Sequence, residues 1–275
     1  MLASPATAPL ASNEPIVLRE DAERIVVLVL NRPDARNALS EAMLAALSDM
    51  LATIAGDETI RAVVIAANGP AFCSGHDLRE LTARRSDPDG GQAFFQHVFQ
   101  SSGKLMRSVV ALPQPVIAVV QGAATAAGCE LVASCDLAVA SAQATFGTPG
   151  VNIGLFCTTP AIPIARNIPR KHALDMLLTG DMMSADDACR FGLVSRVVAP
   201  GTERAEAIKV ARQIASKSAL TMRIGKKAFY QQIEMSLADA YRLGARVMVD
   251  NMLTHDADEG IRAFLEKRPA RWQDR

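Results

Sequence analysis

Two short segments of the sequence combine small residues and ionisable side chains in a way that suits catalysis. In the first, AFCSGHDLREL (71–81), Gly75 precedes His76 and Asp77 at the expected start of a helix. Such a turn directs backbone N–H groups outward, and the helix dipole adds partial positive charge. A negatively charged oxygen that develops during a reaction could be held there. The plainer alternative is an ordinary strand-to-helix turn with Asp77 as the helix cap.

The second segment follows the apolar run at 116–120 and carries few large side chains. Six of the ten residues from Gly122 to Leu131 are Ala or Gly, so a ligand or another backbone can approach closely. Glu130 lies in the first turns of the helix expected next, among apolar neighbours. Burial there would raise the pKa of its carboxyl group toward values useful for proton transfer. The alternative is a solvent-exposed Glu that favours the helix N-terminus.

Other patterns add less. The glycine-rich stretch TFGTPGVNIGL (145–155) either lines a pocket or serves only as a connection. The contiguous residues Ser74 to Asp77 do not form a triad, because neighbours in a tight turn point in different directions. No G-x-G-x-x-G follows a strand, and neither G-x-x-x-x-G-K-[ST] nor G-x-S-x-G occurs, which leaves dinucleotide, nucleoside-triphosphate and serine-hydrolase functions without support.

The composition is that of a globular α/β protein in a reducing compartment. Lys plus Arg and Asp plus Glu number 29 each, so no bulk positive field exists to bind nucleic acid or an anionic membrane. Five cysteines without a C-x-x-C pair, and four scattered histidines, predict reduced thiols and no metal site. The longest apolar stretch is too short for a membrane span. We therefore expect a soluble, cytoplasmic protein, or a mitochondrial matrix protein in a eukaryote.

Strand, turn and helix repeat three times in the first half of the chain, and the second half is mainly helical. This order favours one α/β core over separate domains. We predict strands at 16–19, 24–30, 62–66, 116–120, 136–140 and 192–198. We predict helices at 41–55, 78–85, 91–112, 160–166, 171–178, 185–190, 204–218 and 237–251, and a segment of small residues from 122 that becomes a helix through about 135. The expected organisation is a disordered tail (1–13), a core (14–199) and a helical C-terminal region (200–275).

An ordered set of motifs resembles the crotonase (enoyl-CoA hydratase/isomerase) superfamily. The motifs are LNRPDARNAL, AFCSGHDL, PVIAVVQGAATAAGCELVASCDLAVAS, FGTPGVNIGL, RKHALDMLLTG, ADDACRFGLVSRVV and EGIRAFLEKRPARW. Together they cover essentially everything after residue 13. SGHDLREL, ATAAGCELVASCD and GVNIGLFCTTP are most similar to the enoyl-CoA hydratase domain-containing protein 3 branch, whose mammalian members are mitochondrial.

The resemblance implies a crotonase-like spiral of ββα units and a helical C-terminal region that trimerises and covers the CoA site. Homotrimers that pair into hexamers are expected. The resemblance also implies an oxyanion hole made of the N–H groups of His76 and Ala127; the family usually has Gly at the second position. Expected contacts of the CoA moiety are Ser74, Gly75, Asp77, Leu78 and Arg79, with Arg36 and Lys267 as phosphate partners, the latter from another subunit.

One departure from the family pattern bears on the reaction. The family's hydratases use two glutamates, and Glu130 occupies the first position, but the second falls on Gly150, which has no side chain. Syn addition of water is easiest when one carboxylate orients the water and another handles the α-proton. Losing one acid/base group typically costs about 10²–10⁴-fold in rate.

Three classes of function follow. The leading hypothesis is an acyl-CoA enzyme with Glu130 as acid/base residue that hydrates trans-2-enoyl-CoA, or else isomerises a double bond or performs another enolate reaction. CoA is then part of the substrate, and no cofactor or metal is expected. A catalytically weak acyl-CoA-binding or regulatory protein is the second class. The third is a purely structural oligomer, which the segment of small residues opposes, because a core gains nothing from missing side-chain volume.

Overall fold

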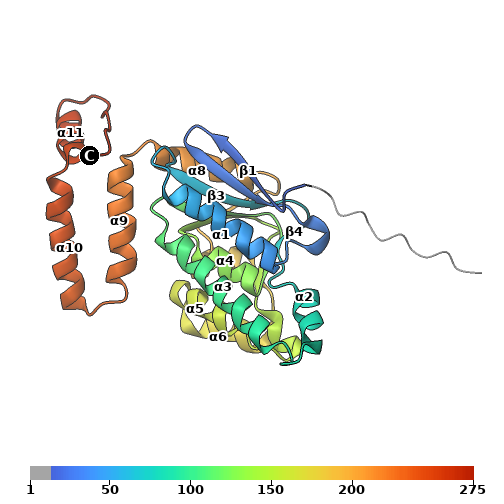
Figure 1. The fold of residues 1–275 in the computed structure, drawn as a ribbon. Coiled ribbons are helices and arrows are strands. Elements are labelled where there is room, and N and C mark those ends of the chain that lie inside the picture. The colour runs from blue at the N-terminus through green and yellow to red at the C-terminus, as the bar shows by residue number, and fades with distance from the viewer. Residues whose placement is uncertain (1–13) are drawn as a thin grey trace, which may run out of the picture.

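The computed structural model of the chain describes residues 14–275. The predicted disordered tail, 1–13, lies outside the described residues. Figure 1 shows a layered body of strands and helices, from which a helical arm at the orange-red, C-terminal end of the colour range projects to one side.

The larger of two sheets has six strands in the order β1-β2-β3-β5-β7-β10. β1 pairs with β2 in antiparallel fashion, and all other neighbours are parallel. The bounds are β1 Val17–Ala22, β2 Ile25–Leu30, β3 Ala62–Ala67, β5 Val116–Val120, β7 Leu137–Ser141 and β10 Arg196–Val198. These are the six strands that the apolar runs predict.

A second sheet of four very short strands stands beside the first, in the order β4-β6-β8-β9. Its members are β4 Ala71–Cys73, β6 Ala123–Thr125, β8 Thr145–Gly147 and β9 Met183–Ser184. Along the chain, β3, β5 and β7 of the large sheet are each followed by one of these short strands and then by helical structure. The ββα spiral that the resemblance implies is therefore confirmed. The glycine-rich stretch at 145–155 begins with a strand, β8, that we did not predict.

Both faces of the large sheet are buried, which explains the continuous apolar run of β2. Val26, Leu28 and Leu30 enter one core, and Ile25, Val27 and Val29 enter the other. The first core is covered by α1 (Glu41–Ala55), α3 (Gln92–Ala111) and α4 (Ala127–Ser134). The second is covered by α8 (Glu203–Ala215), which packs on β3, β5 and β7. The alternation of side chains along a strand thus serves two layers at once.

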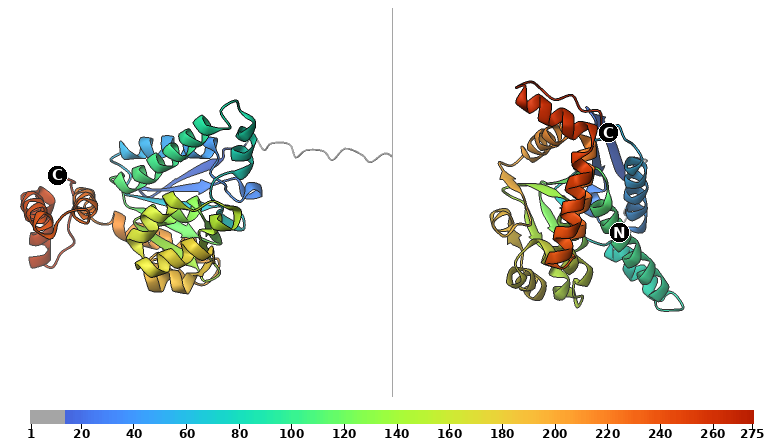
Figure 2. Two further views of the ribbon diagram at one scale, coloured as in Figure 1. Left: turned by 90° about the horizontal axis from the view of Figure 1, so that it is seen from below. Right: turned by 90° about the vertical axis from the view of Figure 1, so that its left-hand side faces the viewer.

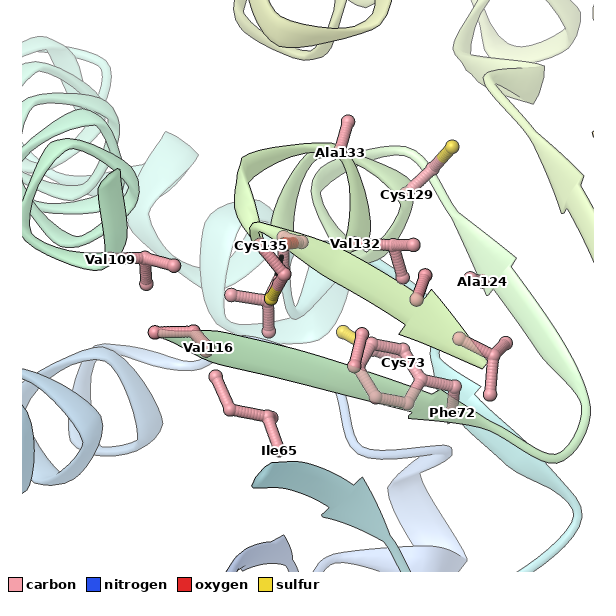
Figure 3. Close-up of a cluster of buried hydrophobic side chains, with 14 of the residues drawn as sticks. Ile65, Phe72, Cys73, Val109, Val116, Ala124, Cys129, Val132, Ala133 and Cys135 are labelled. Atoms are coloured by element: carbon pink, nitrogen blue, oxygen red, sulfur yellow. Dashed lines mark hydrogen bonds between the residues drawn. The ribbon is translucent and has the colours of Figure 1, made fainter. Parts of the chain in front are cut away.

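The short second sheet is held against the first core by close packing around β4. Phe72 and Cys73 of β4 are fully buried, and Figure 3 shows them among Val116 and Ile65 of the large sheet and Val132 of α4. The remaining helical elements of the body are η1 Pro33–Ala35, α2 Leu78–Ala83, η2 Arg84–Ser86, η3 Pro149–Ile153, α5 Thr158–Asn167, α6 Arg170–Thr179 and α7 Ala185–Phe191.

The arm consists of α9 (Ala219–Gln232), α10 (Leu237–Met252) and α11 (His255–Leu265). It projects from the side of the body opposite α2 (Figures 1 and 2). The helical region that stands apart from the sheets therefore begins at α9, later than the expected residue 200, because α8 belongs to the second core. Our helix predictions missed α9 and α11. Neither α9 nor α10 has a buried residue.

A partly buried polar cluster attaches the arm to the body. The Lys226 ammonium group of α9 lies 2.6 Å from a carboxylate oxygen of Asp136 and also donates to the carbonyl oxygens of Val109 and Gln114. The Tyr230 hydroxyl donates to the other oxygen of Asp136 at 2.9 Å. These contacts fix the orientation of the arm. If the arm moved away, the Asp136 charge would lose its partners while largely out of water. No helix described within residues 14–275 has the length and apolar character needed to cross a bilayer.

Candidate active site

The first backbone donor lies in the turn between β4 and α2. Leu39 N–H donates to Gly75 O at 2.8 Å, and Asp77 N–H donates to Leu39 O at 3.4 Å. Leu39 and His76 thus form a parallel bridge, in which the residues on either side of His76 make the hydrogen bonds to Leu39. The N–H of His76 itself is therefore directed away from Leu39. Within residues 14–275 it donates to no acceptor. The turn thus presents one free N–H group.

The second donor lies at the start of α4. Ala126 has φ 49° and ψ −120°, a backbone conformation that an L-residue adopts only at a cost of about 1 kcal/mol or more. Its N–H donates to Gly147 O at 2.8 Å, which fixes the turn. Ala127 is the first helical residue, and its own N–H has no acceptor among the described residues. Helix α4 adds the partial positive charge of its N-terminus.

Two glycines bring the donors together. A Cβ atom added to Gly75, where φ is +94°, would lie 2.9 Å from Ala126 Cβ and 3.3 Å from Ala127 N. A Cβ atom added to Gly128 would lie 2.2 Å from Cys73 O. The β4–α2 turn and the start of α4 are therefore in direct backbone contact. Two N–H groups without acceptors on adjoining segments suit an oxygen that carries negative charge.

Glu130 is buried, so the solvent-exposed alternative is wrong. The residue is 3% exposed, on a helix whose residues are all buried. Burial raises the pKa of its carboxyl group to about 7, against a hydrogen bond from Thr159 that lowers it. A carboxyl group with a pKa near neutrality can both accept and return a proton at physiological pH. It follows the Ala127 donor by three residues, less than one turn of helix.

The position of the second family glutamate is closed by backbone. A Cβ atom at Gly150 would lie 2.3 Å from Leu155 O and 2.8 Å from Cys157 Sγ. The turn is held by a hydrogen bond from Leu155 N–H to Gly150 O at 2.9 Å. A side chain at position 150 would not fit, because the loop that follows Gly150 occupies the space where it would begin.

Most of the expected CoA contacts lie in or next to the β4–α2 turn. Asp77 caps α2 by accepting from the N–H groups of Arg79 and Glu80, as the plainer alternative proposed, and it pairs with Arg32 at 3.2 Å. Leu78 and Arg79 are exposed at the start of α2. Ser74 N–H donates to Arg36 O at 3.0 Å, which brings the exposed Arg36 beside the turn.

Lys267 lies far from this turn in its own chain. It follows α11 at the end of the arm, which projects from the side of the body opposite α2 (Figure 1).

The imidazole of His76 is enclosed next to the turn. Both ring nitrogens are buried without a hydrogen-bond partner among the described residues. The ring packs edge-on against Phe99 at a centroid distance of 5.2 Å, and burial lowers its pKa. The neutral ring therefore contributes packing, whereas the backbone N–H is left without an acceptor.

Two residues that position the site were missed by sequence reasoning. Asn37, at φ 53°, donates from its side chain to Asn68 O (2.8 Å) and Ala71 O (3.0 Å), and so locks the NRPDARNAL loop to β4. Thr159 donates to a carboxylate oxygen of Glu130 at 3.2 Å. Asn readily adopts the αL conformation, so Asn37 in the turn after Pro33 was a usable signal in the sequence. No local signal marks Thr159.

Comparison with known proteins agrees with this geometry. The sequence profile described as enoyl-CoA hydratase/isomerase matches residues 20–275. The chain belongs to the enoyl-CoA hydratase/isomerase family. Within this family, which is part of the crotonase superfamily, it is 47% identical over 245 residues to the human protein named enoyl-CoA hydratase domain-containing protein 3, mitochondrial, with 89% of this chain and 80% of that protein covered.

Solved structures of the family superpose closely. A Mycobacterium smegmatis enoyl-CoA hydratase gives a TM-score of 0.90 at 48% identity, with 94% of this chain and 99% of that chain covered. The human enoyl-CoA hydratase domain-containing protein 3 also gives 0.90, at 45% identity, covering 94% and 100% of the two chains. The crotonase fold and the predicted domain-containing protein 3 branch are thereby confirmed.

Proposed function

We propose that the protein acts on acyl-CoA thioesters and stabilises their enolates in an oxyanion hole formed by the N–H groups of His76 and Ala127. The observation that carries this proposal is the contact at Gly75, which sets two N–H groups without acceptors side by side, close to a buried carboxyl group. Hydrogen bonds from such fixed donors strengthen as negative charge grows on the thioester oxygen. The proposed reaction uses no cofactor besides the CoA of the substrate.

Hydration of a trans-2-enoyl-CoA is the reaction we assign first. Glu130, in its ionised form, accepts a proton from water while the water oxygen bonds to the β-carbon. The electrons of the double bond move onto the thioester oxygen, which the two N–H groups hold. The resulting enolate collapses as its α-carbon takes a proton from Glu130, which yields 3-hydroxyacyl-CoA. A carboxyl group with a pKa of about 7 suits both halves of this cycle.

A specific observation favours double-bond isomerisation as the second candidate. The closed turn at Gly150 leaves Glu130 without a second carboxylate at the position used by the family's two-glutamate hydratases. Isomerisation needs only one base, which removes a proton from one carbon and returns it to another through the same enolate. Glu130 alone can do this.

The deciding experiment offers crotonyl-CoA and a 3-enoyl-CoA to the wild-type protein and follows the enone absorbance. Hydration removes this absorbance from crotonyl-CoA, and isomerisation creates it from the 3-enoyl substrate. We expect turnover of at least one substrate, with hydration slower than in the family's two-glutamate hydratases because one acid/base group is missing. Tight binding of both acyl-CoAs without turnover would contradict the catalytic proposal and favour a binding protein.

We further propose that copies of the chain assemble through the arm as trimers or pairs of trimers. Large apolar side chains of α10 and α11 are exposed in the single chain, among them Leu237 (76%), Tyr241 (75%), Met248 (68%) and Phe264 (81%). Exposed apolar surface of this extent is typical of an interface. Assembly would also allow Lys267 to reach a neighbouring site.

Light scattering tests the assembly. We expect a mass of three or six chains of 29.3 kDa for the wild type. The double variant Tyr241→Arg and Met248→Arg should shift the mass toward one chain, because both positions lie on one face of α10, seven residues apart. A wild-type mass of a single chain would refute the proposal.

A further inference from the structure

The proton-handling residue is held by a hydroxyl group from the next helix. Thr159 is the second residue of α5, which packs against α4. Its Oγ1 donates to Glu130 Oε2 at 3.2 Å. Since Glu130 and Thr159 come from different helices, the hydrogen bond sets the carboxyl group in one orientation relative to both.

The two oxygens of Glu130 have different surroundings. Oε2 accepts the hydrogen bond from Thr159, whereas Oε1 accepts none within residues 14–275. Although the residue as a whole is only 3% exposed, Oε1 is not fully enclosed by protein atoms. It therefore remains accessible. One oxygen is therefore fixed by the protein and the other is open to a substrate.

Among the described groups around Glu130, only Thr159 can orient its carboxyl group. The turn at Gly150 excludes a side chain on that side, and the space is taken by Leu155 O and Cys157 Sγ. The thiols of Cys129 and Cys157 lie near Glu130, and burial raises the pKa of both. Both thiols are therefore uncharged near neutrality. No charged side chain of α3, α4, α5 or β6 acts on the carboxyl group within the described part of the chain.

We propose that Thr159 is the positioning residue of this site: its hydroxyl fixes Oε2 of Glu130 and so directs Oε1 to the α-carbon of the bound acyl thioester. The inference rests on the proposed role of Glu130 in proton transfer. It explains how a site with one carboxylate keeps that group oriented where two-glutamate relatives have a second acid.

The test compares Thr159→Val, which keeps the shape and removes the hydroxyl, with Thr159→Ser, which keeps the hydroxyl. Loss of a hydrogen bond to an ionised group should lower kcat by about 10-fold or more, with KM changed little. The Glu130 limb of the pH–rate profile should move up by about one pH unit, because Thr159 favours the ionised carboxylate. Thr159→Ser should restore both values to near those of the wild type.

Thr158→Val is the matched control, since Thr158 is the preceding, exposed residue of α5 and its hydroxyl donates to Phe156 O. It should leave kcat and the pH profile unchanged. Thr159→Ala serves if the valine variant does not fold. An unchanged kcat and pH profile in both Thr159→Val and Thr159→Ala would overturn the inference.

A second readout does not need turnover. Infrared titration of protein labelled with ¹³C at its glutamate carboxyl groups reports the pKa of Glu130, with the signal assigned by its loss in Glu130→Gln. An upward shift in Thr159→Val supports the positioning role even if no acyl-CoA is turned over, in which case only the proposed function fails. An unshifted titration in an active enzyme refutes the positioning role and leaves the proposed function intact.

Discussion

Glu130→Gln is expected to lower kcat by about 10²–10⁴-fold while acyl-CoA affinity stays within a few-fold. Glutamine keeps the volume of the side chain and can accept the hydrogen bond from Thr159, but it cannot exchange a proton. The oxyanion donors are backbone groups and remain in place. Steady-state rates and calorimetric binding of an acyl-CoA measure the two effects separately. A variant with wild-type kcat would show that another group carries the proton.

The same substitution should stabilise the protein above neutral pH. The folded-state pKa of Glu130, about 7, lies above the ordinary value of 4.5. The folded state therefore binds more protons between these values, and the stability of the wild type falls as pH rises from about 4.5 to 7. Glutamine avoids burying a charge. The free energy of unfolding should therefore rise by on the order of 1–3 kcal/mol at pH 8.

Thermal unfolding of both proteins at pH 5 and pH 8 tests this. The gain of Glu130→Gln over the wild type should be larger at pH 8. An equal difference at both pH values would mean that Glu130 titrates in the folded protein as it does in water, and that its burial does not tune its proton affinity.

Adding a methyl group at Gly128 is expected to lower kcat by about 10²–10³-fold, the effect of losing one oxyanion donor. The new Cβ atom would lie 2.2 Å from Cys73 O, a backbone atom of β4 that cannot move aside cheaply. Helix α4 must then shift away from β4, which separates the Ala127 N–H from the His76 N–H. Gly75→Ala should act in the same direction, because φ is +94° there and Ala126 Cβ lies at 2.9 Å.

Gly103→Ala is the matched control. Gly103 lies inside α3, and a Cβ atom there would meet nothing within 4 Å. Its replacement should leave kcat unchanged and stabilise the helix by about 0.5–1 kcal/mol. Circular dichroism shows whether each variant keeps its fold. If a folded Gly128→Ala protein retained kcat within a few-fold of the wild type, the spacing of the two donors would not limit catalysis.

Elements with strong local signals were predictable from sequence. The helix predicted at 41–55 forms over these residues, because Ser40 caps it by accepting from Met43 N–H. The strand predicted at 116–120 is β5. The short strands β6 and β8 were missed, since three residues are too few for a periodic pattern and these strands form through pairing with distant neighbours.

Helices α9 and α11 were also missed. Exposure in the single chain does not explain this, because α10 has no buried residue either and was predicted, and the apolar residues of α11 lie on one face at helical spacing. The sequence itself places Glu130 three residues after Ala127, whereas the pairing of His76 with Ala127 was expected only from the family resemblance. Thr159 lies 29 residues from Glu130 and becomes visible only once α4 and α5 pack. Likewise, the sequence reveals a missing side chain at Gly150 but not the backbone of Leu155 in its place.

The most direct test of enolate chemistry is exchange of the α-protons of butyryl-CoA with D₂O, followed by NMR. A saturated thioester cannot be hydrated or isomerised, so exchange reports only proton removal next to a polarised carbonyl. The account predicts deuterium incorporation by the wild type and its loss in Glu130→Gln. Incorporation that persists in Glu130→Gln, or its absence in a wild-type protein saturated with butyryl-CoA, would contradict the account.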